Sequence, residues 1–329
     1  MKRNIYLKTI PPAEAVARVK ASIDREALIR EETIPSHEAS GRVLAHAVHA
    51  RYSSPTFHSA AMDGYAVNAR STFAAREGHP LTLKAGETCF AVNTGHPMPE
   101  GCDAVIMIEQ VMLDGGSVTI EAPAFPWQHV RRIGEDIVAT ELLFPRNHQL
   151  RPWDVGALLS GGIWDVPVWE RVTVRIIPTG DEVLDFTTHP DPGKGQVVES
   201  NSQMLAALAR ELGCVVERAA PVPDNPEALH QALKDSLDAG RHLTIFCAGS
   251  SAGSKDFTRA TLEKEGEILT HGIAAMPGKP SLLANCRGRL VAGAPGYPVS
   301  ALVCFKELLE PLISWLSHRE PPAKTVVPV

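Results

Sequence analysis

Carboxylates and a lysine in the second half of this sequence are of the types that handle a phosphate group or a divalent cation. Glu182 and Asp256 each lie in a loop of small residues that follows an apolar run, and Lys279 lies in the loop PGKP. Carboxylates can hold a divalent cation or position a water, whereas a lysine and the N-terminus of a helix opening at Ser300 can neutralise phosphate. These groups are therefore candidates for phosphate chemistry.

The stretch TIFCAGSSAGSKD (244–256) is the clearest of these loops. Residues 243–247 form a short apolar run that predicts a buried parallel strand, and a predicted helix begins near Thr258. Backbone N–H groups in the loop between them, together with the helix N-terminus, can hold an anion such as phosphate. The loop lacks GxxxxGK[ST] and GxGxxG, so an ordinary turn of small residues is an equal alternative.

Four such loops are expected at one edge of one sheet, because predicted strands and helices alternate from Arg171 onward. Alternation of this type predicts an α/β domain with a doubly wound, mostly parallel sheet, whose ligand site lies at the carboxyl ends of the strands. Turn chemistry alone explains any single loop, whereas four together favour a pocket. The loops are 178–182, 248–254, 277–280 and 295–300, the strands begin at 172, 215 and 243, and the helices span 202–212, 224–240 and 299–316.

The first half of the sequence has a different residue pattern: from Ile34 to about Leu143, short apolar runs are broken by Gly, Pro, Asn and Asp. This texture predicts a β-rich domain, with a hairpin around Asp114-Gly115-Gly116. Helices are predicted at 12–23 and 152–160, and we expect them to pack together with the β region inserted between them. The expected domains are a discontinuous helical or linker domain (1–50 and 137–170), the inserted β-rich domain (51–136), the α/β domain (171–318) and a tail (319–329).

Composition limits the function classes. The 329 residues, 44% hydrophobic and 21% charged, suit two or three globular domains, and the net charge of −6 argues against a nucleic-acid partner. The six cysteines form no CxxC pair and the 13 histidines show no metal-binding spacing. We expect reduced thiols, a cytoplasmic location, no signal peptide and no membrane span.

The β-rich half also holds carboxylates, at Asp63 beside Gly64 and at Asp136 in RRIGEDI (131–137). A turn at Asp63 and a solvated loop at Asp136 explain both from composition alone. Ion pairing of Arg131 or Arg132 at the surface would contribute little to stability. The residue types by themselves assign no chemistry here.

Seven motifs in order give these residues a context. They are MDGYAV (62–67), TGHPMPEGCDAVIMIE (94–109), RRIGEDI (131–137), TGDE (179–182), SN (200–201), PGKP (277–280) and PGYPVSA (295–301). In order and spacing the sequence resembles the MoeA/gephyrin-type molybdopterin molybdenumtransferases over nearly its whole length. That resemblance implies a cytoplasmic enzyme that inserts molybdate into adenylylated molybdopterin and releases AMP. It also implies Mg²⁺ and a homodimer, with each site between the β domain of one subunit and the molybdopterin-binding domain of the other.

The resemblance also implies roles for particular residues. Matching carboxylates on the β-domain side are Asp63 and Asp136, and those on the molybdopterin-domain side are Glu182, Asp224 and Asp256. Lys279 is the expected cation, and Glu182 and Asp256 are the expected metal ligands. Contacts to the pterin phosphate or nucleotide are expected from Thr179, Gly180, Asp181, Gly249, Ser250, Ser251, Gly253, Pro277, Gly278, Pro295, Gly296 and Ser300.

Several positions depart from the family pattern. Ser250 replaces a glycine, Met276 replaces the first lysine of KPGKP, Tyr297 replaces the asparagine of PGNPVSA, and His58 replaces an aspartate. The family usually continues into a fourth small β domain, whereas this sequence ends at Val329. These departures leave two alternatives open: a paralogue that binds or delivers molybdopterin without catalysis, and a CinA-like nucleotide hydrolase on the same fold. MDGYAV and GEDI argue against the second alternative.

Overall fold

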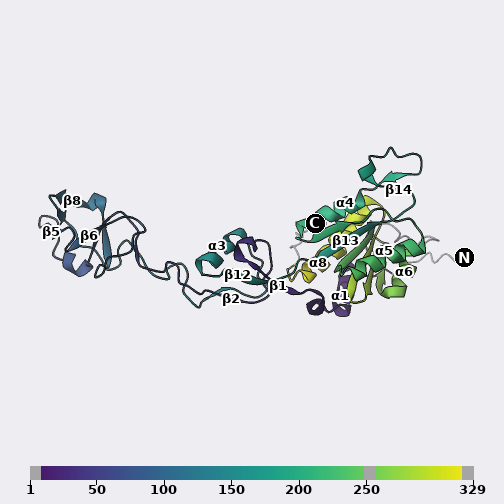
Figure 1. Ribbon diagram of the computed structural model, residues 1–329, viewed down its shortest axis with the longest axis horizontal. Helices are drawn as coiled ribbons and strands as arrows, with labels where there is room; N and C mark the ends of the chain where they lie inside the picture. Colours follow the sequence, from purple (N-terminus) through teal and green to yellow (C-terminus); the bar gives the residue numbers. More distant parts are fainter. Residues whose placement is uncertain (1–8, 248–256, 321–329) are drawn as a thin grey trace, which may run out of the picture.

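The computed structural model describes residues 9–247 and 257–320. Three units follow one another along an elongated molecule (Figure 1). A β-rich unit that carries β5, β6 and β8 forms one end, and a layered α/β unit that carries β13, α4 and α5 forms the other. A smaller unit with α3, β2 and β12 lies between them.

The α/β unit is built on a six-stranded sheet with the strand order β16-β13-β17-β20-β19-β18. Its first four strands run parallel, and β19 and β18 are antiparallel to their neighbours, so the predicted doubly wound, mostly parallel sheet is confirmed. The strands are β13 (Thr173–Pro178), β16 (Val215–Arg218), β17 (Leu243–Cys247), β18 (Gly266–His271), β19 (Leu282–Cys286) and β20 (Arg289–Ala294). Every residue of β17 is buried, as expected for a central strand covered on both faces.

Helices cover both faces of this sheet. On one face, buried side chains of α1, α4 and the C-terminal helices form one core cluster, and on the other face α5 and α6 form a second. The helices are α1 (Pro12–Ser22), α4 (Asn201–Glu211), α5 (Pro226–Asp238), α6 (Phe257–Glu265), α7 (Pro298–Cys304) and α8 (Glu310–Leu316). A π-helical segment, η5 (Phe305–Leu309), joins α7 to α8, so the predicted helix from 299 to 316 is continuous but not wholly α-helical.

Helix α1 belongs to the α/β unit. It contacts β18, β19, η5 and α8, and its buried Ala15 and Val19 lie in the same core cluster as Val174 of β13. Leu158 of α3 (Pro152–Ser160) lies in a separate cluster in the middle unit. The prediction that helices 12–23 and 152–160 pack together is therefore wrong, because an apolar stripe fixes which face is buried but not its partner. The other domain boundaries stay predictions.

The middle unit consists of short antiparallel pairs around α3. Its elements are η1 (Ser36–Glu38), β1 (Glu31–Pro35) paired with β12 (Asp165–Trp169), and β2 (Val48–His49) paired with β11 (Leu142–Phe144). The short helix α2 (Arg25–Leu28) packs on the α/β unit instead, where the Arg25 guanidinium donates to the Trp315 carbonyl of α8. Arg319, which follows α8, joins this unit to the α/β unit: its guanidinium donates to the carbonyl oxygens of Leu212 and Gly41. A single side chain thus connects the end of α4 to the middle unit.

The β-rich unit contains two three-stranded antiparallel sheets, β6-β4-β7 and β5-β9-β8, and the pair β10-β3. Residues Asp114 and Ser117 pair across a two-residue Gly115-Gly116 turn with positive φ at both glycines, so the predicted hairpin is confirmed. The elements are β3 (Ser59–Ala60), β4 (Gly64–Val67), η2 (Ala69–Thr72), β5 (Leu81–Lys84), β6 (Cys89–Val92), β7 (Ala104–Met107), η3 (Ile108–Gln110), β8 (Val111–Asp114), β9 (Ser117–Ile120) and β10 (Val130–Arg131).

All six cysteines are free thiols, five of them buried and Cys102 half-buried, as the sequence predicted. Burial raises the pKa of the Cys214 and Cys286 thiols to about 12. Within the described ranges, no helix is long and apolar enough to cross a membrane.

Candidate active site

Three of the four predicted loops meet at one edge of the α/β sheet. Parallel strands β13, β17 and β20 end there in register, with Pro178 beside Cys247 and Cys247 beside Ala294. Strand β19 runs the other way, so its first residue, Leu282, lies at this same edge beside Gly293. The loops 178–182, 277–281 and 295–300 therefore enclose one cavity of about 740 Å³. The fourth predicted loop, 248–254, lies outside the described residues.

The cavity collects many of the predicted binding residues. Thr179, Glu182, Pro277, Gly278, Lys279, Pro295, Gly296 and Ser300 all line it, whereas Gly180, Asp181 and Asp224 lie in the adjacent loops without lining it. Gly249, Ser250, Ser251, Gly253 and Asp256 lie outside the described part of the chain, so their roles stay predictions.

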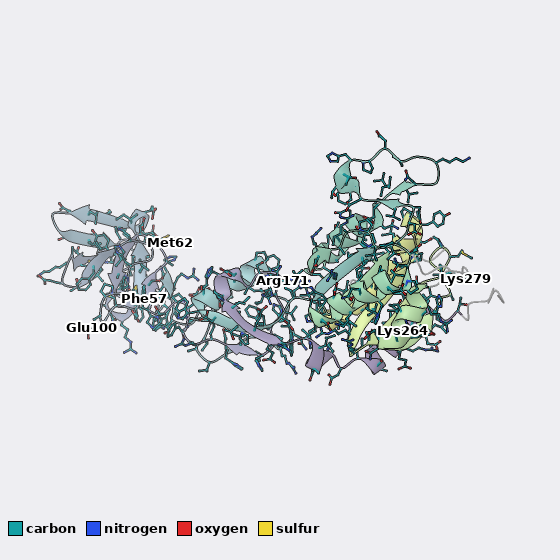
Figure 2. The ribbon with its side chains drawn as sticks, turned by 45° about the vertical axis from the view of Figure 1, so that its right-hand side comes forward. Phe57, Met62, Glu100, Arg171, Lys264 and Lys279 are labelled. Carbon is teal, nitrogen blue, oxygen red and sulfur yellow. The ribbon has the colours of Figure 1, made fainter. Side chains whose placement is uncertain are left out.

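Lys279 presents an exposed ammonium group at this cavity (Figure 2). Its backbone is fixed, because the Lys279 carbonyl accepts from Ile273 N–H at 2.9 Å and the Gly278 carbonyl accepts from the Ser281 hydroxyl at 2.7 Å. Among the described residues, no carboxylate or carbonyl is bonded to the ammonium group. A rigid loop with an unpaired cation is suited to bind an anionic ligand.

Glu182 presents a carboxylate to the same cavity. Gly180 leaves room for it, since a Cβ at this position would lie 3.0 Å from both Glu182 carboxylate oxygens. Gly180 also has φ of 136°, a backbone conformation that disfavours other residues. The glycine of TGDE is thus explained by the close approach of the Glu182 side chain.

The remaining polar groups of TGDE hold the loop itself. The Thr179 hydroxyl donates to the Cys247 carbonyl at 3.1 Å, and the Gly180 N–H donates to the Val222 carbonyl at 3.1 Å. An Asp181 carboxylate oxygen accepts from the Asp224 N–H at 3.0 Å. In this structure the Asp181 carboxylate fixes the loop before α5 beside the cavity.

Asn201 is a cavity-lining residue for which composition gave no signal, although the SN motif included it. It is buried at the start of α4, lines the cavity and donates from its side-chain amide to the Gly296 carbonyl at 2.7 Å. This bond holds the loop 295–298 in place. A buried asparagine is well suited to this task because its amide donates without carrying charge.

A surface segment that sequence reasoning missed forms one wall of the cavity. This flap, residues 183–198, carries the parallel pair β14 (Val183–Leu184) and β15 (Val197–Val198) and the short η4 (Phe186–Thr188), and it projects from the sheet edge (Figure 1). Val183, Val197 and Val198 line the cavity. Strands of two residues have no periodicity that would have predicted them.

Arg218 of β16 anchors the flap. Its guanidinium contacts a carboxylate oxygen of Asp185 at 3.1 Å and one of the buried Glu199 at 3.4 Å, and it stacks on the Phe186 ring. Glu199 also accepts from both the N–H and the hydroxyl of Ser202. These bonds tie both ends of the flap to the start of α4.

Asp63 and Asp136 lie in the β-rich unit, away from this cavity. Figure 2 shows Met62, the neighbour of Asp63, at the opposite end of the chain from Lys279. Asp63 accepts from the N–H and the hydroxyl of Thr94, and these hydrogen bonds lower the pKa of its carboxyl. Arg131 Nη2 donates to both carboxylate oxygens of Asp136, at 2.8 and 3.1 Å. Within one chain, the predicted carboxylates that the structure describes thus form two separate groups.

Comparisons with known proteins match both halves of the chain. A family profile described as the MoeA N-terminal region (domain I and II) matches residues 10–162, and one described as a probable molybdopterin binding domain matches residues 175–315. A molybdopterin molybdenumtransferase of Haemophilus influenzae is 34% identical over 309 residues, which cover 88% of this chain and 74% of that protein. Molybdopterin molybdenumtransferase 2 of Mycobacterium tuberculosis is 34% identical over 86% of this chain and 74% of its own length.

Solved structures agree with the sequence comparisons. The crystal structure of a molybdopterin biosynthesis MoeA protein from Pyrococcus horikosii has a TM-score of 0.81 at 29% identity and covers 95% of this chain and 81% of that one. Together, the profiles match most of the chain and the relatives extend over both the β-rich and the α/β units. The chain belongs to the MoeA family of molybdopterin molybdenumtransferases.

Proposed function

We propose that this protein inserts molybdate into adenylylated molybdopterin with release of AMP, as the last metal-loading step of molybdenum cofactor biosynthesis. The observation that carries the proposal is the cavity at the sheet edge, where Lys279 and Glu182 lie on rigid loops beside the ends of three strands. In the proposed reaction an oxygen of water or molybdate attacks phosphorus of the phosphoanhydride; a new P–O bond forms, the bridging P–O bond breaks and AMP is released. No covalent protein intermediate is needed.

Each charged group has a defined task in this proposal. Lys279 and the loop N–H groups bind the phosphates and stabilise the charge that develops on them. The unpaired oxygens of Glu182 suit Mg²⁺, which takes one or two carboxylates together with substrate phosphates and water, and the bound ion would neutralise phosphate charge. Asp256 and Asp224 are the proposed further carboxylates of this half of the site.

The proposal includes a homodimer. Met62, the neighbour of Asp63, lies at the opposite end of the molecule from Lys279 (Figure 2), and Asp136 follows β10 of the β-rich unit. One subunit therefore cannot bring Asp63 to its own cavity without a large rearrangement. We propose that the β-rich unit of a second copy supplies both carboxylates. A twofold arrangement of this kind gives two equivalent sites, each built from both subunits.

The activity can be tested with purified protein, adenylylated molybdopterin, molybdate and Mg²⁺, by measuring AMP release and the formation of active cofactor. Lys279→Ala should lower kcat/KM by about 10²-fold, since removing a charged hydrogen-bond donor costs about 2–3 kcal/mol. Lys264→Ala removes an exposed lysine on α6, outside the cavity, and should have no effect. Binding of the nucleotide without AMP release above a no-enzyme control would contradict catalysis and favour a delivery role.

The shared site can be tested by subunit complementation. Asp63→Asn and Lys279→Ala are co-expressed with different tags, and the mixed dimer is isolated by two affinity steps. Each parental homodimer should be inactive, whereas the mixed dimer has one intact site and should recover about half of the wild-type activity. An inactive mixed dimer with normal folding would contradict the shared site.

A further inference from the structure

Two large apolar side chains lie exposed at the rim of the cavity. Met276 is 85% exposed and Tyr297 is 81% exposed, and both line the cavity that Lys279 and Glu182 share. Burying side chains of this size is normally favourable, so their exposure at a concave site indicates a surface that a ligand covers.

The backbones that carry these two side chains are held in place. The Asn201 amide binds the Gly296 carbonyl directly before Tyr297, and Pro298 follows it as the first residue of α7. The loop after Met276 packs on α7. A Cβ added at Gly278 would lie 3.1 Å from Cγ1 of Val303 and 3.6 Å from the Ser300 carbonyl oxygen. Rigid loops present the rim with little loss of backbone entropy when a ligand binds.

The chemistry of the cavity defines the ligand that fits it. Lys279 is three residues from Met276 in the same loop, so a phosphate bound at Lys279 places the rest of the ligand close to the rim. Val197 and Val198 of the flap add further apolar surface to the same cavity. A phenol ring beside a thioether favours a planar, polarisable group, since aromatic rings stack on tyrosine and contact methionine sulfur favourably.

We propose that Tyr297, supported by Met276, stacks on a planar nitrogen heterocycle of a phosphorylated ligand and is a specificity-determining residue of this site. The inference rests on the proposed function, whose substrate carries two such rings, a pterin and an adenine. Both present the same chemistry to the rim, and the experiment distinguishes them.

The test is isothermal titration of wild-type protein and of Tyr297→Ala with three probes. AMP carries adenine and phosphate, a phosphate ester of 6-hydroxymethylpterin carries pterin and phosphate, and ribose 5-phosphate carries phosphate without a base. Tyr297→Ala should weaken binding of the ring that stacks by about tenfold, which is the usual effect of removing one stacking partner. Binding of ribose 5-phosphate should be unchanged. Tyr297→Phe keeps the ring and should bind as the wild type does.

Val299→Ala is the matched control, because Val299 is 64% exposed two residues away and does not line the cavity. Equal losses for AMP and ribose 5-phosphate, or no loss for either ring-bearing probe, would overturn stacking by Tyr297. If Tyr297→Ala changed the oligomeric mass in sedimentation but left probe binding unchanged, the rim would be a contact between subunits. That result would also overturn stacking by Tyr297. Ring-dependent binding without AMP release would contradict only the proposed function, whereas AMP release with unchanged binding by Tyr297→Ala would contradict only the stacking.

Discussion

Arg218→Met is predicted to release the flap from the α/β unit. The Arg218 side chain is 14% exposed and the Glu199 side chain is 3% exposed, so this ion pair is shielded from water. The Arg218 Nε–H also donates to the Ser202 hydroxyl at 2.9 Å. Methionine keeps much of the aliphatic length against Phe186 but removes the charge, which isolates the effect of the guanidinium.

The expected cost follows from what the substitution leaves behind. Removing one partner of a buried ion pair costs about 3–5 kcal/mol, because the other charge stays buried. Glu199 keeps two hydrogen bonds, from the Ser202 N–H at 2.7 Å and the Ser202 hydroxyl at 2.5 Å. We therefore expect the lower end, about 3 kcal/mol, which corresponds to an opening equilibrium about 10²-fold more favourable.

Amide hydrogen exchange over residues 183–199 measures this opening directly. The Val197 N–H donates to the Glu182 carbonyl and the Glu199 N–H to the Leu184 carbonyl, so both amides should lose about 10²-fold of protection. Arg287→Met removes two ion pairs of an arginine that is 45% exposed and lies outside the flap, and it should leave this protection unchanged. Protection of the flap that stays within threefold of the wild type in Arg218→Met would refute the reasoning.

Three further substitutions or measurements test other parts of the fold. Gly64→Ala should lower the thermal midpoint of the β-rich unit, measured by calorimetry, because a Cβ at this position would lie 2.0 Å from the Ile106 carbonyl oxygen. His318 stacks on Trp169, and burial lowers the pKa of its imidazole to about 4. In the unfolded chain this pKa is about 6.5, so the unfolded state binds the proton first and stability is lost as pH falls from about 6.5 to 4. His318→Phe should flatten this dependence, by up to about 3 kcal/mol, in urea unfolding at pH 7 and 4.5. Iodoacetamide should modify the half-buried Cys102 well before Cys304, whose pKa burial raises to about 11, and peptide mass spectrometry reports the order.

Local patterns predicted much of the α/β unit. The apolar run 243–247 is a fully buried strand, and the predicted helices 202–212 and 224–240 correspond to α4 and α5. These features depend on residues close together in the sequence, where propensity and turn chemistry act directly. Placing three loops at one sheet edge needed only the alternation of strands and helices.

Features that depend on distant residues were not predictable in this way. The partner of α1 is set by packing against β18, β19 and α8, which are more than 240 residues away in the sequence. Arg218 binds Asp185, 33 residues earlier, and no local pattern pairs these two charges. Motif order singled out Glu182, Lys279 and Ser300, which all line the cavity, although their roles stay predictions. The exposed rim of Met276 and Tyr297 became visible only from the fold.

The charges of the β-rich unit and of the cavity in the α/β unit determine how much positive charge the proposed shared site needs. Hydrogen bonds from Thr94 lower the pKa of the Asp63 carboxyl, so the β-rich unit contributes this negative charge. Arg131 pairs with Asp136, so that pair supplies no free cation. Among the described residues that line the cavity, Lys279 is the lone lysine or arginine, and Glu182 adds a carboxylate. A phosphoanhydride and molybdate bring further negative charge, which one lysine cannot balance. We therefore propose that a divalent cation balances this charge. We expect its binding to depend on Glu182, because that carboxylate has no bonded partner in the described part of the chain.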